Sequence, residues 1–387
     1  MGRLSVEGVK EARALMGEFP LDLKVLQRVL DYLNDAVYIT DRDRCIVLWN
    51  RRAEEITGHS REDVVGHRCR DNILSHVDKE GRPLCSTELC PLYRTMEKNS
   101  PTRMPAVIYA RTKDRGRIPV SVSTAPLHDD AGKVIGGVEI FRDESEALAD
   151  LELARRIQQH IQTPELPKLK TLEMQVQYDS LGLVGGDFYE VREVGAETAG
   201  VLVADVQGHG VSAALYTMVL RSVSDNLRAS ATRPGEFMGA ANKALSAIAL
   251  DEVFATAVYA VVEGKSGVVQ YANAGHPRPL KIAPGKGAAT LEGGGMPLGL
   301  TEGETYESLD ASLGTSETML LYTDGATDVR DKDGRMLGSE GLAEKAGAID
   351  WGKGAGAMRS LHRGLRDFSG DVRFSDDVLL LSCRRRG

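Results

Sequence analysis

The sequence lacks several features that would define its class at once. No apolar run approaches the roughly 20 residues that a helix needs to cross a bilayer, and the first residues lack the apolar core of a signal peptide. The chain holds only five cysteines among 387 residues, an odd number that does not suggest a disulfide framework. No long internal repeat or low-complexity tract occurs. We therefore expect a protein of the reducing cytoplasm.

An excess of positive charge is also missing. The formal net charge is -8, whereas a nucleic-acid-binding protein usually carries a basic stripe. No Walker-type phosphate-binding loop occurs. The composition is that of an ordinary globular protein, with 42% hydrophobic and 27% charged residues. Because 387 residues exceed what one core usually organises, two domains are expected.

A single helix is predicted between these two domains, at residues 144–165. Apolar side chains recur there at three- and four-residue steps, the period of one helix face, at Leu148, Leu151, Ala154, Ile157 and Ile161. Such a stripe has to be buried. It can pack on its own domain or pair with the same helix of a second chain in a coiled-coil dimer, and periodicity alone does not choose between the two.

Residues 25–143, before this helix, mix short helices with alternating strands. "AVYITDRDRCIVLWN" predicts strand, turn and strand, and later strands flank turns near residues 114–116 and 129–132. The region resembles a PAS domain in "DAVYITDRDRCIVLWNRRAEEITGH", "EDVVGH" and "PLHDDAGKVIGGVEIFRDESE". The resemblance implies an antiparallel sheet with flanking helices that senses a ligand, a cofactor or a partner. Residues 1–24 form an extension without assignment.

Residues 166–387 alternate strands and helices, and several strands follow one another directly, which indicates an α+β fold. Aspartates stand where apolar strands or glycine turns end: Asp187 in "GGDFYE", Asp205 in "VLVADVQGHG", Asp324 in "LLYTDGATD", and Asp376 with Asp377 in "SDDVLLL". One such aspartate is usually a turn or cap residue. Four segments with the same feature favour a common site.

Converging carboxylates would repel one another by several kcal/mol per pair at an effective dielectric constant near 20, so cations or protonation would have to relieve them. Oxygen ligands without Cys or His favour hard ions such as Mg²⁺ or Mn²⁺. Two such ions about 4 Å apart can activate a water for attack on phosphorus. Sequence spacing alone does not show that the aspartates converge.

The blocks around them resemble the SpoIIE/RsbU-type branch of the PPM metal-dependent serine/threonine protein phosphatases, whose fold is type 2C-like. The matching segments run in order as "LELARRIQQHIQTPELP", "VGGDFYEV", "ADVQGHGVSAAL", "FATAVYAVVE", "YANAGHPRPL", "GGMPLGL", "LLYTDGATDVRDKDGRMLG" and "SDDVLLL". The resemblance implies a C-terminal α-β-β-α sandwich. A diguanylate cyclase is disfavoured, because Phe188 follows Asp187 directly where that motif needs another acidic residue.

The resemblance also implies roles for individual residues. Asp205 would bridge two metal ions, the backbone carbonyl of Val206 would complete one site, and Asp187, Asp324 and Asp376 would supply the other carboxylates; Asp205 and Asp187 would be the catalytic pair. Three further residues would support the ligands or the substrate: Asp377, His209 and His276. The turn built on "NAGHP" can equally be structural. Two positions depart from the family pattern, with Leu379 in place of Thr and Glu190 in place of Asp.

The sensor half offers a second set of metal-ligating types: Cys69, His76, Cys85 and Cys90. Three thiols and an imidazole suit Zn²⁺ or an iron centre, although the spacing matches no standard motif and free cysteines are common in cores. "GHRCR" is similar in part to the flavin-binding subset of PAS domains. Arg68 in place of Asn and the missing later Asn positions disfavour flavin.

The resulting hypothesis is a cytoplasmic signalling enzyme. Its PAS domain senses a cue, and the linker helix relays this cue to the C-terminal domain. The family resemblance implies hydrolysis of phosphoserine or phosphothreonine on a partner protein, which in this branch is usually a STAS-type anti-sigma-factor antagonist. The apolar stripe of the linker helix favours a homodimer, and the negative net charge and the lack of a long apolar run disfavour nucleic-acid and membrane partners. The alternative is a catalytically silent scaffold that binds its partner without hydrolysis. The presence of all the expected aspartates speaks against that alternative.

Overall fold

The computed structural model contains two compact units, residues 1–150 and 151–387. Each is described by itself. The residues that the structure describes are 23–85, 87–104, 107–114, 116–162, 165–208, 210–248, 253–370 and 374–386. The predicted extension 1–24 and His209 therefore lie outside them, except for the last two residues of the extension.

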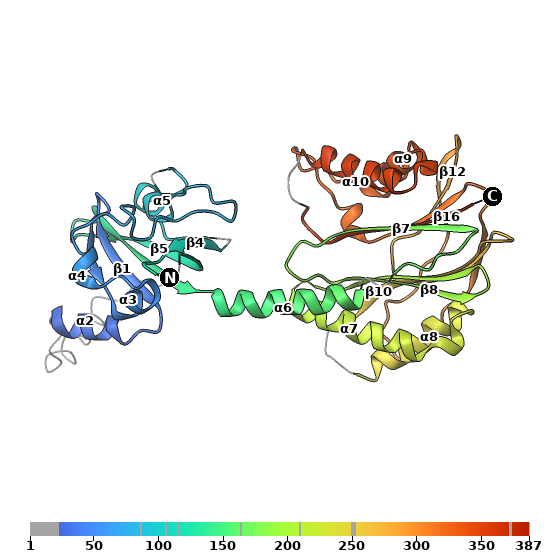
Figure 1. The fold of residues 1–387 in the computed structure, drawn as a ribbon, viewed down its shortest axis with the longest axis horizontal. Coiled ribbons are helices and arrows are strands. Elements are labelled where there is room, and N and C mark those ends of the chain that lie inside the picture. Colours follow the sequence, from blue (N-terminus) through green and yellow to red (C-terminus); the bar gives the residue numbers. More distant parts are fainter. Residues whose placement is uncertain are drawn as a thin grey trace. The chain divides into compact units, whose positions relative to one another are not determined.

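The first unit is an antiparallel sheet with short helices (Figure 1). The strands follow the order β2-β1-β6-β5-β3, and β4 also pairs with β5. The strands are β1 (Ala36–Asp41), β2 (Ile46–Trp49), β3 (Thr102–Arg103), β4 (Ile108–Arg111), β5 (Arg117–His128) and β6 (Val134–Asp143). The helices are α2 (Leu23–Asp31), α3 (Arg51–Thr57), α4 (Arg61–Val64) and α5 (Pro91–Lys98). This arrangement confirms the predicted antiparallel PAS architecture.

Local chemistry explains how the first helices attach to this sheet. Asn50 is fully buried and caps α3, since its side-chain oxygen accepts hydrogen bonds from the backbone N–H groups of Ala53 and Val37, both at 2.9 Å. Gly58 ends the same helix in the left-handed conformation that glycine adopts without strain. The core behind them contains Tyr38, Trp49 and Phe141, whose rings contact one another.

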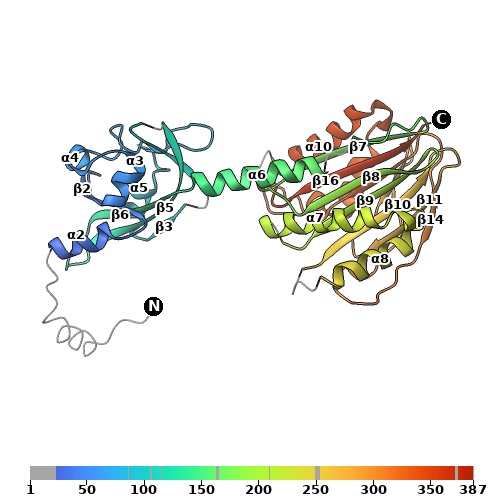
Figure 2. The ribbon, with the colours of Figure 1, turned by 60° about the horizontal axis from the view of Figure 1, so that its bottom comes forward.

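The second unit has four layers, with two five-stranded antiparallel sheets between two pairs of helices (Figures 1 and 2). One sheet has the order β14-β11-β10-β9-β8 and the other β13-β12-β15-β16-β7. Helices α7 (Val211–Asn226) and α8 (Pro234–Ser246) pack on the first sheet, and α9 (Gly338–Gly347) and α10 (Ala355–Ser369) on the second. The predicted α-β-β-α sandwich is confirmed.

The strands of the first sheet are β8 (Asp187–Gly195), β9 (Thr198–Val206), β10 (Ala255–Glu263), β11 (Val268–Ala274) and β14 (Leu309–Ser312). Those of the second are β7 (Leu172–Asp179), β12 (Leu280–Ala283), β13 (Gly287–Thr290), β15 (Thr318–Tyr322) and β16 (Val378–Arg385). A continuous apolar cluster lies between the sheets, with Val203, Val258 and Leu381 among its fully buried members. This core fixes one sheet against the other and so sets the separation of residues at their ends.

Helix α6 (Ser145–Gln162) occupies the predicted linker. Its apolar residues Leu153 and Ile157 are 50% and 44% exposed, whereas Gln158 is only 4% exposed. The most buried side chain of the described helix is therefore polar, and its partners are given below. Within the described residues, no helix combines the length and the apolar character needed to span a membrane.

Candidate active site

Asp187 and Asp205 face each other on neighbouring strands. Strand β8 begins at Asp187, and the register of the antiparallel pair sets Asp187 directly opposite Asp205 near the end of β9. Directly opposed residues have Cβ atoms about 4.5–5.5 Å apart. Asp187 is 2% exposed, and Asp205 is half-buried. The first two predicted site residues are thus brought together by sheet pairing.

Asp324 and Asp376 stand at the ends of two neighbouring strands of the other sheet. Asp324 follows β15 and begins the short helix η2 (Asp324–Ala326), and Asp376 lies two residues before β16, the strand that pairs with β15. The two turns touch at Gly325, where an added Cβ would lie 1.9 Å from the carbonyl oxygen of Asp377 and 3.4 Å from Cβ of Asp376. Only glycine allows this close approach.

A threonine connects the two sheets at this point. The Thr323 hydroxyl donates a 2.7 Å hydrogen bond to Oδ2 of Asp187 and accepts one of 3.0 Å from the backbone N–H of Leu379. Thr323 is fully buried, so both partners are desolvated. Leu379 stands where the family pattern has a threonine, so the sequence did not show which hydroxyl group forms hydrogen bonds there. In the structure this hydroxyl belongs to Thr323.

Asp377 holds the loop that precedes Asp187. Its Oδ1 accepts the backbone N–H of Leu181 at 2.6 Å, and its Oδ2 accepts that of Gly186 at 2.7 Å. A Cβ on Gly186 would lie 2.9 Å from the carbonyl oxygen of Val206, so this carbonyl faces the same loop. Asp377 therefore orders the Gly-Gly-Asp segment against the end of β9 by backbone hydrogen bonds.

These carboxylates raise one another's pKa. Burial, and then the charge of Asp205, holds the pKa of Asp187 well above its usual range. Burial is the largest cause that raises the pKa of Asp205 to about 7, and the charges of Asp324, Asp376 and Asp377 are the next causes. The pKa of Asp324 is raised by burial and then by Asp376. All four predicted ligands thus contribute to one region of concentrated negative charge.

This donor set fits hard divalent cations. Carboxylate and carbonyl oxygens are their preferred ligands, and a cation relieves the repulsion that raises these pKa values. Among the described residues, no three His, Cys, Asp or Glu side chains converge tightly enough as they stand to hold an ion. Binding would therefore have to draw the aspartates closer together.

Comparison with known families identifies both units. A family model described as Stage II sporulation protein E (SpoIIE) matches residues 195–386, and a PAS domain model matches residues 34–146. The chain carries a PAS domain followed by a SpoIIE-family domain. The SpoIIE match covers Asp205, Asp324 and Asp376, while Asp187 lies eight residues before its start.

Curated relatives agree with this assignment. The chain is 27% identical over 183 residues to the phosphoserine phosphatase RsbP of Bacillus subtilis, covering 46% of this chain and 45% of the relative. It is 24% identical over 193 residues to the phosphoserine phosphatase RsbU of the same organism, covering 49% and 57%. Protein IcfG of Synechocystis is 26% identical over 224 residues, covering 50% and 35%. The chain thus spans about half the length of the curated relatives it matches.

Solved structures show the same fold. The SiaA-PP2C domain of Pseudomonas aeruginosa superposes with a TM-score of 0.56 at 24% identity, covering 62% of this chain and 98% of that one. The RsbU and RsbW domains of Rv1364c from Mycobacterium tuberculosis give a TM-score of 0.50 at 26% identity, covering 57% and 62%.

Gln158 was not singled out from the sequence, yet it joins three segments of the SpoIIE-family domain. Its Nε2 donates to the carbonyl oxygen of Gly185 at 2.7 Å and to Oγ1 of Thr217 at 3.3 Å, and its Oε1 accepts the Gly185 N–H at 3.2 Å. Helix α6 is thereby attached to the loop before Asp187 and to α7. The only sequence signal was a glutamine beside an apolar stripe.

His276 lies in a hydrogen-bonded turn behind the aspartates. The backbone N–H of His276 donates a hydrogen bond to Oδ1 of Asn273 at 2.9 Å. The ring Nδ1 lies 2.9 Å from Oγ1 of Thr256, a residue of β10 that pairs with Asp205 of β9. Burial lowers the pKa of His276 to about 3, so the ring is neutral at physiological pH. These contacts link His276 through Thr256 to the strand position beside Asp205.

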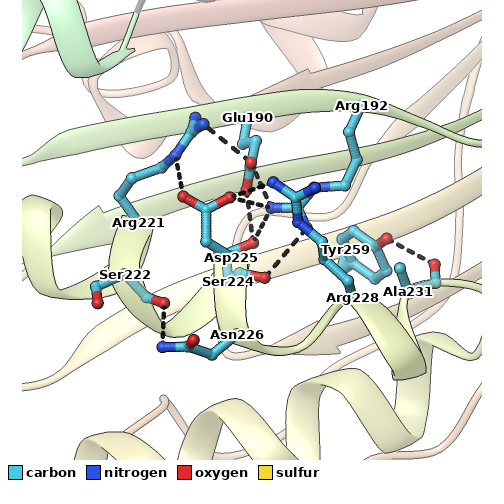
Figure 3. A network of polar contacts seen from close by, with 10 residues as sticks. All are labelled: Glu190, Arg192, Arg221, Ser222, Ser224, Asp225, Asn226, Arg228, Ala231 and Tyr259. Carbon is cyan, nitrogen blue, oxygen red and sulfur yellow. Dashed lines mark hydrogen bonds and ion pairs between the residues drawn. The ribbon is translucent and has the colours of Figure 1, made fainter.

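Glu190 anchors β8 to α7 through the charged network of Figure 3. Its carboxylate accepts hydrogen bonds from Arg192 and from the Ser224 hydroxyl, and Arg221 lies 3.4 Å away. Asp225 pairs with Arg221 at 3.0 Å in the same network. The glutamate that replaces the family's usual aspartate is thus buried and fully engaged, three residues after Asp187.

The four sensor residues lie together in the core of the PAS domain. Cys69, His76 and Cys90 are buried, and Cys85 is partly exposed. The thiols of Cys69, Cys85 and Cys90 influence one another electrostatically. The His76 ring instead faces Glu139, with 3.7 Å between Nε2 and Oε1. Metal binding by this set stays a prediction.

Proposed function

We propose that the chain is a metal-dependent phosphoserine/phosphothreonine protein phosphatase that its PAS domain regulates. The observation that carries the proposal is the meeting of four acidic strand ends from two sheets, which raise one another's pKa, in a SpoIIE-family domain. Such a site suits the binding of divalent cations beside a phosphate group. The relatives RsbP and RsbU are named phosphoserine phosphatases, which supports the same reaction class.

Mg²⁺ or Mn²⁺ would be held by Asp187, Asp205, Asp324, Asp376 and the carbonyl of Val206. When bound, the ions supply an acidified water as nucleophile and neutralise the phosphate oxygens. The chain's own residues prepare this reaction through position. Thr323 orients the Asp187 carboxylate, and Asp377 fixes the loop before it.

The substrate proposed here is a phosphorylated STAS-type regulator. The support is the resemblance to the RsbU-type branch and the structural likeness to a protein that combines RsbU and RsbW domains. A folded protein substrate needs an open surface, and Asp376 is exposed at the edge of the site. Asp205, partly exposed beside it, leaves the carboxylates accessible from outside.

We further propose a homodimer. Leu153 and Ile157 on α6 are exposed at a spacing of four residues, and so are Val211 and Leu215 on α7, at 45% and 55%. Each pair forms an apolar stripe on one helix face. Burial of such stripes against a second copy would remove about 25 cal/mol of unfavourable free energy per Å² of apolar surface.

The test uses the full chain with Mn²⁺ and a serine-phosphorylated STAS protein. Phosphate release by the wild type, abolished in Asp205→Asn and retained in the exposed control Asp310→Asn, would support the enzyme. Hydrolysis of p-nitrophenyl phosphate without hydrolysis of the STAS protein would contradict the substrate class. Tight binding of the phosphoprotein without any release would instead identify the silent scaffold.

A further inference from the structure

The PAS domain holds two cysteines, Cys85 and Cys90, in one hydrogen-bonded segment. Two backbone hydrogen bonds lie close to these cysteines: the Thr87 N–H donates to the Leu84 carbonyl at 3.3 Å, and the Cys90 N–H donates to the Thr87 carbonyl at 3.2 Å. Hydrogen bonding between their side chains is also the largest cause of the opposite pKa shifts of Cys85 and Cys90. A disulfide needs the two sulfurs to approach to roughly 2.05 Å, which neighbouring thiols in one such segment can do.

The surroundings of Cys90 stabilise a thiolate. Cys90 is the N-cap residue of α5, where the helix dipole favours negative charge. The hydrogen bond from Cys85, with help from the Arg44 guanidinium, lowers the pKa of Cys90 to about 6. Arg44 is itself placed over the Tyr93 ring, 5.6 Å from its centroid.

The other three thiols differ from this pair. Burial raises the pKa of Cys69 and of Cys383 to about 12, so both stay protonated. Cys45 is partly exposed in the turn between β1 and β2, where its N–H bonds to Oδ1 of Asp41 at 2.9 Å. Cys45 therefore serves as a matched control for reactivity that follows from exposure alone.

We propose that Cys85 and Cys90 form a reversible intramolecular disulfide, which makes the PAS domain a thiol-based sensor of hydroperoxides. The placement of both cysteines in one hydrogen-bonded segment, the N-cap position of Cys90 and the partial exposure of Cys85 carry this proposal. Only its regulatory consequence rests on the proposed phosphatase function, because disulfide formation is measured without turnover.

The chemistry balances with a hydroperoxide as the two-electron oxidant. The thiolate of the pair attacks the O–O bond, forming a sulfenic acid and releasing an alcohol, or water from hydrogen peroxide, after protonation. The second thiol then attacks the sulfenic sulfur, the S–S bond forms, and water leaves. Two thiols and one hydroperoxide thus give one disulfide, one alcohol and one water. A dithiol reductant reverses the change.

The disulfide would change the contacts of the sheet strand that leads to the linker helix. The backbone N–H of His76 bonds to the Cys85 sulfur at 3.2 Å, and the His76 ring faces Glu139 on β6. Helix α5 contacts the same sheet through the 2.6 Å pair of Thr95 and Thr124. Strand β6 ends at Asp143 and α6 begins at Ser145. A movement at the start of α5 would be transmitted through these contacts to β6 and so to the first turn of α6.

The experiment treats the reduced full-length chain with stoichiometric hydrogen peroxide, alkylates the remaining thiols and digests with trypsin. Cys85 and Cys90 lie on one tryptic peptide, residues 80–94, because the Arg82–Pro83 bond resists cleavage. We expect this peptide two hydrogens lighter and unalkylated, a fall from five to three free thiols, and full reversal by dithiothreitol. Cys85→Ser and Cys90→Ser should each abolish the change, and Cys45→Ser should keep it.

Three outcomes would overturn the proposal. Oxidation at Cys45 or Cys69 in preference to the pair would show that the placement of the pair in one segment does not direct reactivity. Sulfinic acid without the lighter peptide would show that the second thiol does not react with the sulfenic acid to form a disulfide. Stoichiometric zinc or iron in the purified chain that blocks alkylation of the pair would assign the cluster to a metal. If the disulfide forms but phosphate release changes less than about 5-fold between the two redox states, the regulatory consequence is refuted.

Discussion

Both units of the chain concentrate buried titratable groups, but they do so in opposite settings. In the SpoIIE-family domain the carboxylates stand at strand ends, where burial and then the charges of neighbouring carboxylates raise the pKa values of Asp187, Asp205 and Asp324. In the PAS domain Tyr38, His76 and Glu139 lie inside the core, at most 2% exposed. There too burial is the main cause of each pKa shift, but within this described core no second carboxylate beside Glu139 adds to it.

The difference has a chemical consequence. Repelling carboxylates at an accessible edge store unfavourable energy that a cation from solution can relieve, so this site is built for exchangeable ligands. A closed core favours neutral side chains, because burial penalises their charged forms. The reactions open to such a core are therefore proton transfer and disulfide formation between neighbouring thiols. The predictions below test this contrast, beginning with the largest expected effect.

Removing one carboxylate should reveal the stored repulsion. We expect Asp205→Asn to lower phosphate release by about 10³-fold or more, comparable to the loss of a principal electrostatic group in other enzymes. The same variant should unfold at a higher temperature than the wild type in EDTA, because one repelling charge is gone.

Mn²⁺ at about 100 times its dissociation constant should then stabilise the wild type by about 2.7 kcal/mol and Asp205→Asn by much less. Thermal unfolding with and without the ion measures both effects. Equal stabilisation of the two proteins would show that Asp205 holds no metal. Asp310→Asn, at an exposed residue bonded to Gln270, is the matched control.

Thr323 allows a test of positioning without any change of charge. Thr323→Val keeps the shape but removes the hydroxyl, leaving Asp187 Oδ2 and the Leu379 N–H without this partner. Unsatisfied buried groups of this kind cost about 1–3 kcal/mol. We expect a fall in kcat of about 10- to 100-fold with little change in KM, and recovery in Thr323→Ser. Failure of serine to restore activity would argue for packing rather than hydrogen bonding.

These residues also show how far the sequence carries the interpretation. The two domains, the sandwich and the four acidic segments could be predicted, because each depends on periodicity or on a short block of letters. Thr323 and Asp187 lie 136 residues apart and meet only across the two sheets. A threonine at the end of an apolar strand carries no local signal of that contact.

Gln158 was missed for a related reason. In an amphipathic helix a glutamine is ordinarily assigned to the solvated face, whereas here it is 4% exposed and bonded to a glycine backbone. The apolar neighbour Ile157, expected inside, is 44% exposed. Periodicity identifies the helix, but the choice of which face is buried depends on partners that come from other segments.

Gln158→Ala should disturb the metal site from helix α6, which supplies none of the proposed metal ligands. The change removes both bonds to Gly185, two residues before Asp187, at a cost of about 1–3 kcal/mol. We expect phosphate release to change by about 10-fold, and the Mn²⁺ concentration for half-maximal activity to shift as well. Arg156→Ala, at an exposed position of the same helix, should change neither quantity. An unaltered metal dependence in Gln158→Ala would contradict a positioning role.

The smallest effect on turnover is expected in the PAS core, where Glu139→Gln should leave phosphate release unchanged. Burial raises the pKa of Glu139 well above its usual range, which favours the neutral carboxylic acid that glutamine resembles. Because the pKa is higher in the folded state, the stabilisation is complete below the unfolded pKa of about 4.3 and is lost as the pH rises toward the folded value. The wild-type PAS domain should therefore lose up to about 1.4 kcal/mol of stability per pH unit relative to Glu139→Gln.

Denaturant unfolding of both full-length chains between pH 6 and pH 8.5, followed through Trp49 fluorescence, measures this difference. Parallel curves would mean that Glu139 is ionised in the fold, and the closed core would then resemble the charged edge of the phosphatase domain after all.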